Sequence, residues 1–133
     1  MTENEVAAVV VDAAYKVHTT LGPGLLESVY VAVLAHEIGK RGLPVVRQVP
    51  VQVRYDGLVD SAGCRFEEGF RADLIVSDLL IVEVKSTETT HPVHKKQLLT
   101  YLRLTGKKLG LLINVGLPLV KDGVTRVVNG LSD

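Results

Sequence analysis

The stretch RADLIVSDLLIVEVK, residues 71–85, sets charged side chains into two otherwise apolar runs. The runs themselves have the composition of strands that are buried on both faces of a sheet. A carboxylate or an ammonium group in such a strand costs several kcal/mol unless it is paired, hydrogen-bonded or bound to a metal. Asp73, Glu83 and Lys85 are therefore candidates for an active site.

The turn inside this stretch decides whether the two acids meet. The two strands are joined near Ser77-Asp78 and must be antiparallel neighbours. Alternation of side chains places Glu83 and Lys85 on one face of the sheet. A two-residue loop would send Asp73 to the opposite face from Glu83, whereas an odd loop or one bulge aligns the two acids. We expect the odd loop or bulge, with Asp78 in a left-handed conformation.

Capping signals, turn residues and hydrophobic periodicity place the other elements around this stretch. The expected helices are 3–20, Leu25 to Lys40 or Arg41, and Pro92 to Leu104 or Thr105. The expected strands are a half-buried strand over 45–55, strands over about 66–76 and 79–85, a strand over 109–115, and a closing hairpin of 119–120 with 124–128 around Asp122-Gly123. Asp56-Gly57 is a turn signal, and 57–69 is expected to be a loop or an irregular hairpin with Cys64 as a filler residue. This order predicts an α/β fold in which helices flank a mixed central sheet and two N-terminal helices precede it.

Length and composition limit the class of protein. A chain of 133 residues is expected to form a single domain over 1–133. No apolar run approaches the roughly 20 residues of a membrane helix. The acidic N-terminus and the single Cys64 predict a cytoplasmic location. The hydrophobic share of 47% also suggests a surface apolar enough for a homodimer.

The charge balance constrains any contact with nucleic acid. Fifteen basic and fifteen acidic residues give a formal net charge of zero, so a long-range attractive field is absent. Any phosphate contact must come from a local patch. The basic residues that could form one are Lys95, Lys96, Arg103, Lys107 and Lys108 around the third helix, with Arg71 nearer the acids. The alternative is an ordinary solvated helix face.

Two carboxylates on adjacent strands are hard oxygen ligands that suit Mg²⁺ or Mn²⁺. A lysine two positions after Glu83 would lie beside such a metal, and this set suits hydrolysis of a phosphodiester bond. The alternative is that Glu83 and Lys85 are paired, solvated charges on a partly exposed sheet, because an isolated E-x-K is a very short motif.

Glu27 and two histidines allow two interpretations each. Glu27 shares a helical stripe with apolar residues such as Val31, where it either joins the site or complements the helix dipole from the first turn. His91 and His94 flank the start of the third helix, where they either contact phosphate or metal or are simply solvated.

A set of motifs over residues 24–116 resembles a known family. Asp73, then Glu83-Val84-Lys85, then Gln97 with Tyr101 on the following helix resembles the PD-(D/E)XK nuclease superfamily. The run from Gly24 to Tyr30 matches the signature of the bacterial GxxExxY proteins, and the run from Leu109 to Gly116 looks like their strand after the helix. Two positions depart from the pattern, because Ala72 replaces a proline and Val115 stands where an aromatic residue is common.

The resemblance implies a restriction-endonuclease-like fold. It also implies a nuclease that requires Mg²⁺ or Mn²⁺ and cleaves nucleic acid, with DNA expected as the substrate in preference to RNA. It implies Glu27, Asp73, Glu83 and the Val84 carbonyl as metal ligands, Lys85 as the catalytic lysine and Gln97 as an assisting residue. Tyr101 is as well explained by packing as by chemistry. The competing interpretation is a module that binds nucleic acid or protein and keeps the nuclease fold without catalysis.

Overall fold

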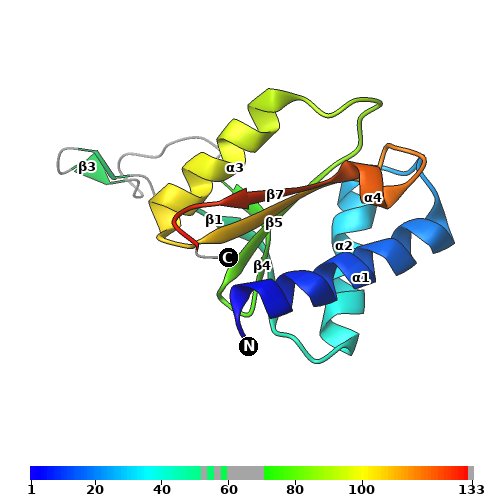
Figure 1. The fold of residues 1–133 in the computed structure, drawn as a ribbon, viewed down its shortest axis with the longest axis horizontal. Helices are drawn as coiled ribbons and strands as arrows, with labels where there is room; N and C mark the ends of the chain where they lie inside the picture. Colours follow the sequence, from blue (N-terminus) through cyan, green and yellow to red (C-terminus); the bar gives the residue numbers. More distant parts are fainter. Residues whose placement is uncertain (52–53, 56–57, 60–70, 132–133) are drawn as a thin grey trace.

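A five-stranded mixed sheet, with strand order β1-β4-β5-β6-β7, forms the centre of the computed structural model (Figure 1). The structure describes residues 1–51, 54–55, 58–59 and 71–131. The strands are β1 Val45–Pro50, β4 Arg71–Val76, β5 Leu80–Lys85, β6 Leu109–Asn114 and β7 Val124–Val128. β5 and β6 are parallel, and the other neighbours are antiparallel. The predicted α/β fold with a mixed sheet is confirmed.

Three helices cover the two faces of this sheet (Figure 1). α1 (Glu3–Leu21) and α2 (Glu27–Lys40) pack on one face, and α3 (Pro92–Thr105) packs on the other. The predicted capping box of α1 is present, since Thr2 N–H donates to Glu5 Oε1 at 2.9 Å and Glu5 N–H donates to Thr2 Oγ1 at 3.2 Å. α3 begins at Pro92 and ends before Gly106, which is left-handed with φ 72°.

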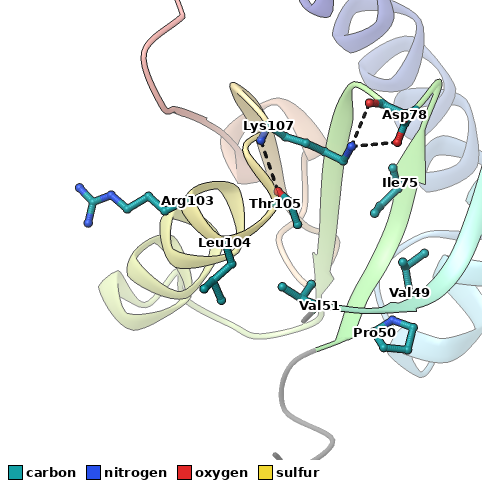
Figure 2. A pocket seen from close by; sticks show the side chains of 9 residues that line it. All are labelled: Val49, Pro50, Val51, Ile75, Asp78, Arg103, Leu104, Thr105 and Lys107. Carbon is teal, nitrogen blue, oxygen red and sulfur yellow. Dashed lines mark hydrogen bonds and ion pairs between the residues drawn. The ribbon is translucent and has the colours of Figure 1, made fainter. Parts of the chain in front are cut away.

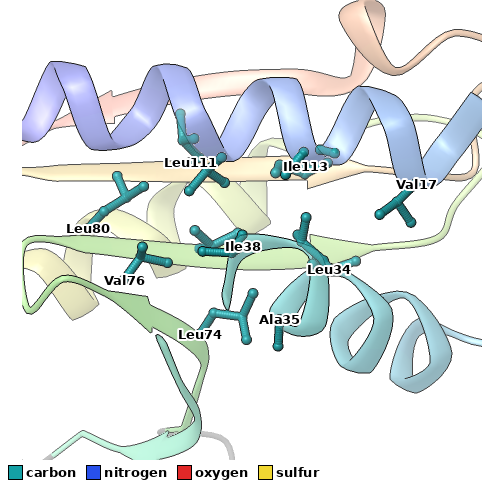
Figure 3. Close-up of a cluster of buried hydrophobic side chains, with 14 of the residues drawn as sticks. Val17, Leu34, Ala35, Ile38, Leu74, Val76, Leu80, Leu111 and Ile113 are labelled. Atoms are coloured by element: carbon teal, nitrogen blue, oxygen red, sulfur yellow. The ribbon is translucent and has the colours of Figure 1, made fainter. Parts of the chain in front are cut away.

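Hydrophobic side chains fill both spaces between sheet and helices. The larger cluster lies between the sheet and α1 and α2, where Leu34 and Ile38 meet Leu74 and Leu111 (Figure 3). Leu80, Val82 and Val84 belong to this cluster, whereas Ile81 belongs to the cluster beneath α3. Alternation along β5 therefore places Glu83 and Lys85 on one face, as the sequence predicts, and this is the face that α3 covers.

The β4–β5 turn has the odd length that the sequence predicts. Val76 pairs with Leu80, which leaves three residues, Ser77 to Leu79, in the turn. Asp78 has φ 55°, as expected, and Ser77 shares this left-handed conformation with φ 53°. The Lys107 ammonium group holds the turn by donating to the Asp78 carboxylate and carbonyl oxygens, each at 2.9 Å.

The predicted strand over 45–55 is wrong as one continuous strand, because its first part stops at Pro50. β1 ends there, and β2 (Arg54–Tyr55) pairs with β3 (Leu58–Val59) in a separate two-stranded sheet. Pro50 lies on an edge strand, where its missing N–H is tolerated. The remainder of the expected loop or irregular hairpin over 57–69, Cys64 and the first part of the expected 66–76 strand lie outside the described residues.

The predicted closing hairpin is also wrong. Residues Val120–Gly123 form a short helix, α4, and β7 pairs with β6 rather than with residues 119–120. Val120 is buried in the core. A Cβ atom at Gly123 would lie 2.2 Å from the Asn114 carbonyl oxygen, so this glycine permits a close backbone approach and does not form a hairpin turn.

None of the helices among the described residues is both long enough and apolar enough to cross a membrane.

Candidate active site

The β4–β5 ladder stops where the two acids begin. Leu74 and Val82 are the last paired residues, although β4 continues back to Arg71 and β5 continues to Lys85. One further step in the same register sets Asp73 opposite Glu83. The two acids therefore lie side by side, as the predicted odd turn requires.

At this point the backbone N–H groups donate to carboxylate oxygens of the opposite strand and not to its carbonyl oxygens. The Asp73 N–H donates to Glu83 Oε1 at 3.2 Å, and the Val84 N–H donates to Asp73 Oδ2 at 2.8 Å. Each acid thus accepts a hydrogen bond from the backbone of the opposite strand. Glu83 is only 4% exposed. The arrangement holds both carboxylates rigidly between two central strands.

β1 is distorted beside the same position. Its pairs with β4 skip Gln48, which has φ 53° and would face Asp73. Val45 packs against the α1 and α2 cluster, while Val49 packs against the α3 cluster, so the strand changes faces at Gln48. The sequence analysis missed this distortion. The visible sign was Arg47, the exception among otherwise apolar odd positions.

Both acids of the pair have a raised pKa. Burial, followed by the charge of Asp73, raises the pKa of Glu83 to about 8. Burial also raises the pKa of Asp73, although the Val84 N–H and the Lys85 charge oppose the shift. At neutral pH the two carboxyl groups therefore carry fewer than two negative charges in the absence of a cation.

Lys85 and Tyr101 lie near the pair, and His94 and Gln97 lie on the same helix as Tyr101. Lys85 is half-buried on the same face of β5 as Glu83, close enough for its charge to lower the pKa of both acids. Burial and the charges of Glu83 and Asp73 raise the pKa of Tyr101 to about 12. Burial, then the charges of Lys85 and His91, lowers the pKa of His94. Gln97 is exposed one turn before Tyr101 on α3.

Glu27 approaches the site from the other face of the sheet. It is the first residue of α2, and its Oε1 accepts the Ser86 N–H at 2.9 Å, just beyond Lys85. Glu27 also contributes a charge that raises the pKa of Asp73. Within the part of the chain that the structure describes, no three side chains of His, Cys, Asp or Glu are grouped to hold a metal ion. The structure thus places Asp73 beside Glu83 and holds Glu27, at the start of α2, against the loop that follows β5.

The residues Gly24, Glu27 and Tyr30 each have a separate structural role. The buried Tyr30 hydroxyl accepts the N–H groups of Gly24 and Leu25 at 3.1 and 3.2 Å and donates to the Gly22 carbonyl. Gly24 has φ 153°, which side chains disfavour. Tyr30 thereby fixes the turn that leads into Glu27. The sequence analysis quoted Tyr30 within a signature but assigned it no role.

We expect Tyr30→Phe to lower the free energy of unfolding by about 1 kcal/mol, because a hydroxyl that serves three backbone groups is lost while water can reach the exposed turn. Chemical denaturation measures this change. Tyr15→Phe is the matched control, because Tyr15 is 60% exposed. Equal stability of both variants and the parent would contradict the role given to the Tyr30 hydroxyl.

The predicted phosphate-binding residues are spread over the surface. Arg71, Lys95, Lys96 and Arg103 are all exposed. A cleft of about 510 Å³ lies between β1, β4 and the end of α3. Arg103 is one of its lining residues, although its guanidinium group extends away from the other labelled side chains (Figure 2). Lys107 was grouped with these residues in the sequence analysis, but its charge is paired with Asp78 at 2.9 Å. Asp73, Glu83 and Lys85 do not line this cleft.

A mixed sheet with helices on both faces, and an acidic pair followed by lysine on its central strands, defines a restriction-endonuclease-like fold. The family model of the PD-(D/E)XK nuclease superfamily matches residues 4–127, and the chain belongs to this superfamily. No curated protein matches the chain, and no solved structure does. The narrower resemblance to GxxExxY proteins stays a prediction.

Proposed function

We propose that this protein hydrolyses phosphodiester bonds of nucleic acid, DNA in preference to RNA, at the Asp73–Glu83 pair with Mg²⁺ or Mn²⁺. We also propose that it belongs to the GxxExxY group within its superfamily. The observation that supports the activity most directly is the exchange of hydrogen bonds between the two acids and the opposing strands, at 3.2 and 2.8 Å.

The residues fit a divalent cation. The backbone bonds engage Oε1 of Glu83 and Oδ2 of Asp73, so each carboxylate has a second oxygen. Burial raises the pKa of both acids, and a hard cation that displaces the proton would offset the cost of the buried negative charge. We assign Asp73, Glu83, the Val84 carbonyl and Glu27 as its ligands. When bound, the cation polarises a phosphoryl oxygen and lowers the pKa of its water.

Lys85 has the clearest catalytic role among the other side chains. It lies on the same face of β5 as Glu83, and its charge reaches both acids. From there its ammonium group stabilises negative charge that develops on the phosphate, or orients the attacking water.

Residues of α3 complete the site. Gln97 is assigned an assisting contact with substrate or water. With its pKa raised to about 12, Tyr101 keeps its hydroxyl proton at neutral pH. With its pKa lowered, His94 is neutral there and adds no charge of its own. The exposed Arg71, Lys95, Lys96 and Arg103 are assigned to the phosphate backbone, where each lost contact reduces binding and its salt dependence.

A cleavage assay tests this proposal. Single- and double-stranded DNA and RNA are incubated with the purified protein and Mg²⁺ or Mn²⁺, and parallel samples contain a chelator. We expect product only with metal, because the acids require a cation to act on a phosphodiester. Asp73→Asn is expected to be inactive.

Asp78→Asn is the matched control for Asp73→Asn. Asp78 is an exposed acid in the turn at the other end of β5, and asparagine tolerates its left-handed conformation. It should cleave as the parent does. Absence of metal-dependent product on every substrate would exclude the catalytic proposal and leave a binding module with the nuclease fold. Equal cleavage by Asp73→Asn and the parent would exclude the assigned site.

A further inference from the structure

We infer that Asn114 is a positioning residue that holds the loop between β5 and α3, and thereby sets Lys85 and Glu27 relative to the acidic pair. The inference about the loop rests on contacts alone, and its consequence for catalysis rests on the proposed function. Asn114 is the last residue of β6, directly beside Lys85 in the parallel register. It is 1% exposed, so its amide must find partners within the protein.

Every hydrogen-bonding group of this amide is directed to loops beside the site. Its Oδ1 accepts the N–H groups of Thr87 at 3.1 Å and Gly116 at 3.0 Å. Its Nδ2 donates to the Thr87 hydroxyl at 3.1 Å and to the Thr90 hydroxyl at 3.5 Å. One buried side chain thus holds the start and the end of the segment that follows Lys85.

The backbone around Asn114 is packed closely enough to transmit this restraint. The Val115 N–H donates to the Lys85 carbonyl at 2.8 Å. A Cβ atom at Gly116 would lie 2.4 Å from the Thr87 carbonyl oxygen, so the two loops touch backbone to backbone. The segment held in this way includes Ser86, whose N–H binds Glu27 at 2.9 Å. Asn114 is therefore connected to Glu27 through Thr87 and Ser86.

Hydrogen exchange in the metal-free full chain tests the positioning role. In Asn114→Ala, amide exchange over 86–90 should rise at least about tenfold, because the variant loses the hydrogen bonds from Asn114 to Thr87 and Thr90, whereas amides in α1 should not change. Asn129→Ala is the matched control, because the Asn129 amide donates to the Lys107 carbonyl at 3.1 Å, at the far end of α3. Exchange over 86–90 that stays at the parent level in Asn114→Ala would overturn the inference.

A second variant covers the case in which Asn114→Ala does not fold. Thr87→Val is nearly isosteric and removes the hydroxyl that accepts from Asn114 Nδ2 and donates to the Thr89 carbonyl. It should raise exchange in the same segment by a smaller factor, and an unchanged segment would overturn the inference. Metal titration, followed as the upward shift in Tm, should show weaker Mg²⁺ binding in both variants but not in Asn129→Ala.

The experiments distinguish a failure of the proposed nuclease function from a failure of the positioning role of Asn114. A parent protein that cleaves no substrate removes the proposed function and leaves the exchange result intact. Loosened exchange over 86–90 with parent-like Mg²⁺ binding overturns the link from Asn114 to the acidic site. Loosened exchange together with weaker Mg²⁺ binding and slower cleavage supports the whole inference.

Discussion

Lys85→Ala should lower the cleavage rate at saturating metal by about 10²–10³-fold, as expected for removal of one fixed charge that stabilises a transition state. Lys85 is half-buried on the α3-facing side of β5, close enough to lower the pKa of both acids. Its loss removes positive charge from that site without removing a proposed metal ligand. Single-turnover cleavage measures the rate, and denaturation confirms that the variant is folded.

Two controls separate chemistry from general charge effects. Lys40→Ala removes a lysine near the far end of α2, where the ammonium group is 3.8 Å from Glu37 and its side chain is 56% exposed. It should cleave at the parent rate. Lys85→Arg keeps the charge but changes its shape, so it should restore only part of the activity. A Lys85→Ala variant as fast as Lys40→Ala would remove Lys85 from the mechanism.

Glu83→Gln should abolish cleavage and yet stabilise the metal-free protein at alkaline pH. The pKa of Glu83 is about 8 in the folded chain, against an ordinary value of 4.5. Between these pH values the folded protein holds a proton that the unfolded chain has lost, so the free energy of unfolding falls as pH rises. The slope is at most about 1.4 kcal/mol per pH unit for one group. The stabilising contribution is complete below pH 4.5 and is lost as pH passes through about 8.

Denaturation curves from pH 5 to pH 9 in a chelating buffer measure this effect. The parent should lose stability across this range, while Glu83→Gln should lose much less and exceed the parent at pH 9. Mg²⁺ should raise the Tm of the parent but not of the variant. A variant less stable than the parent at pH 9 would show that the buried carboxylate is not destabilising.

Glu37→Gln is a control for which the expected change in the free energy of unfolding has the opposite sign. Glu37 lies close to Lys16, Lys40 and Arg41, and the hydrogen bond from Lys16 is the largest cause of its lowered pKa. A lowered pKa gives stability that is present above the ordinary pKa and lost as pH falls. Glu37→Gln should therefore lose stability at neutral pH, where Glu83→Gln gains it.

The sequence by itself determined most of the local structure. The Thr2–Glu5 capping box, Pro92 and Gly106 define helix ends through interactions within a few residues, and the structure confirms them. The three-residue β4–β5 turn could also be predicted, because only an odd turn or a bulge brings Asp73 beside Glu83. The helix ends depend on neighbours in the chain, which a pattern of residues records directly, whereas the turn length followed from the expectation that the two acids share one site.

Only the tertiary structure decided how distant segments meet. Glu27 binds the Ser86 N–H, and Asn114 binds Thr87, across large separations in sequence. Gly123 suggested a hairpin turn, but the structure uses it to bring α4 against β6. The same residue types serve turns, close packing or hydrogen bonding, and which role applies depends on what lies opposite in the folded chain. Local propensity carries no information about that partner until the sheet and helices have packed together.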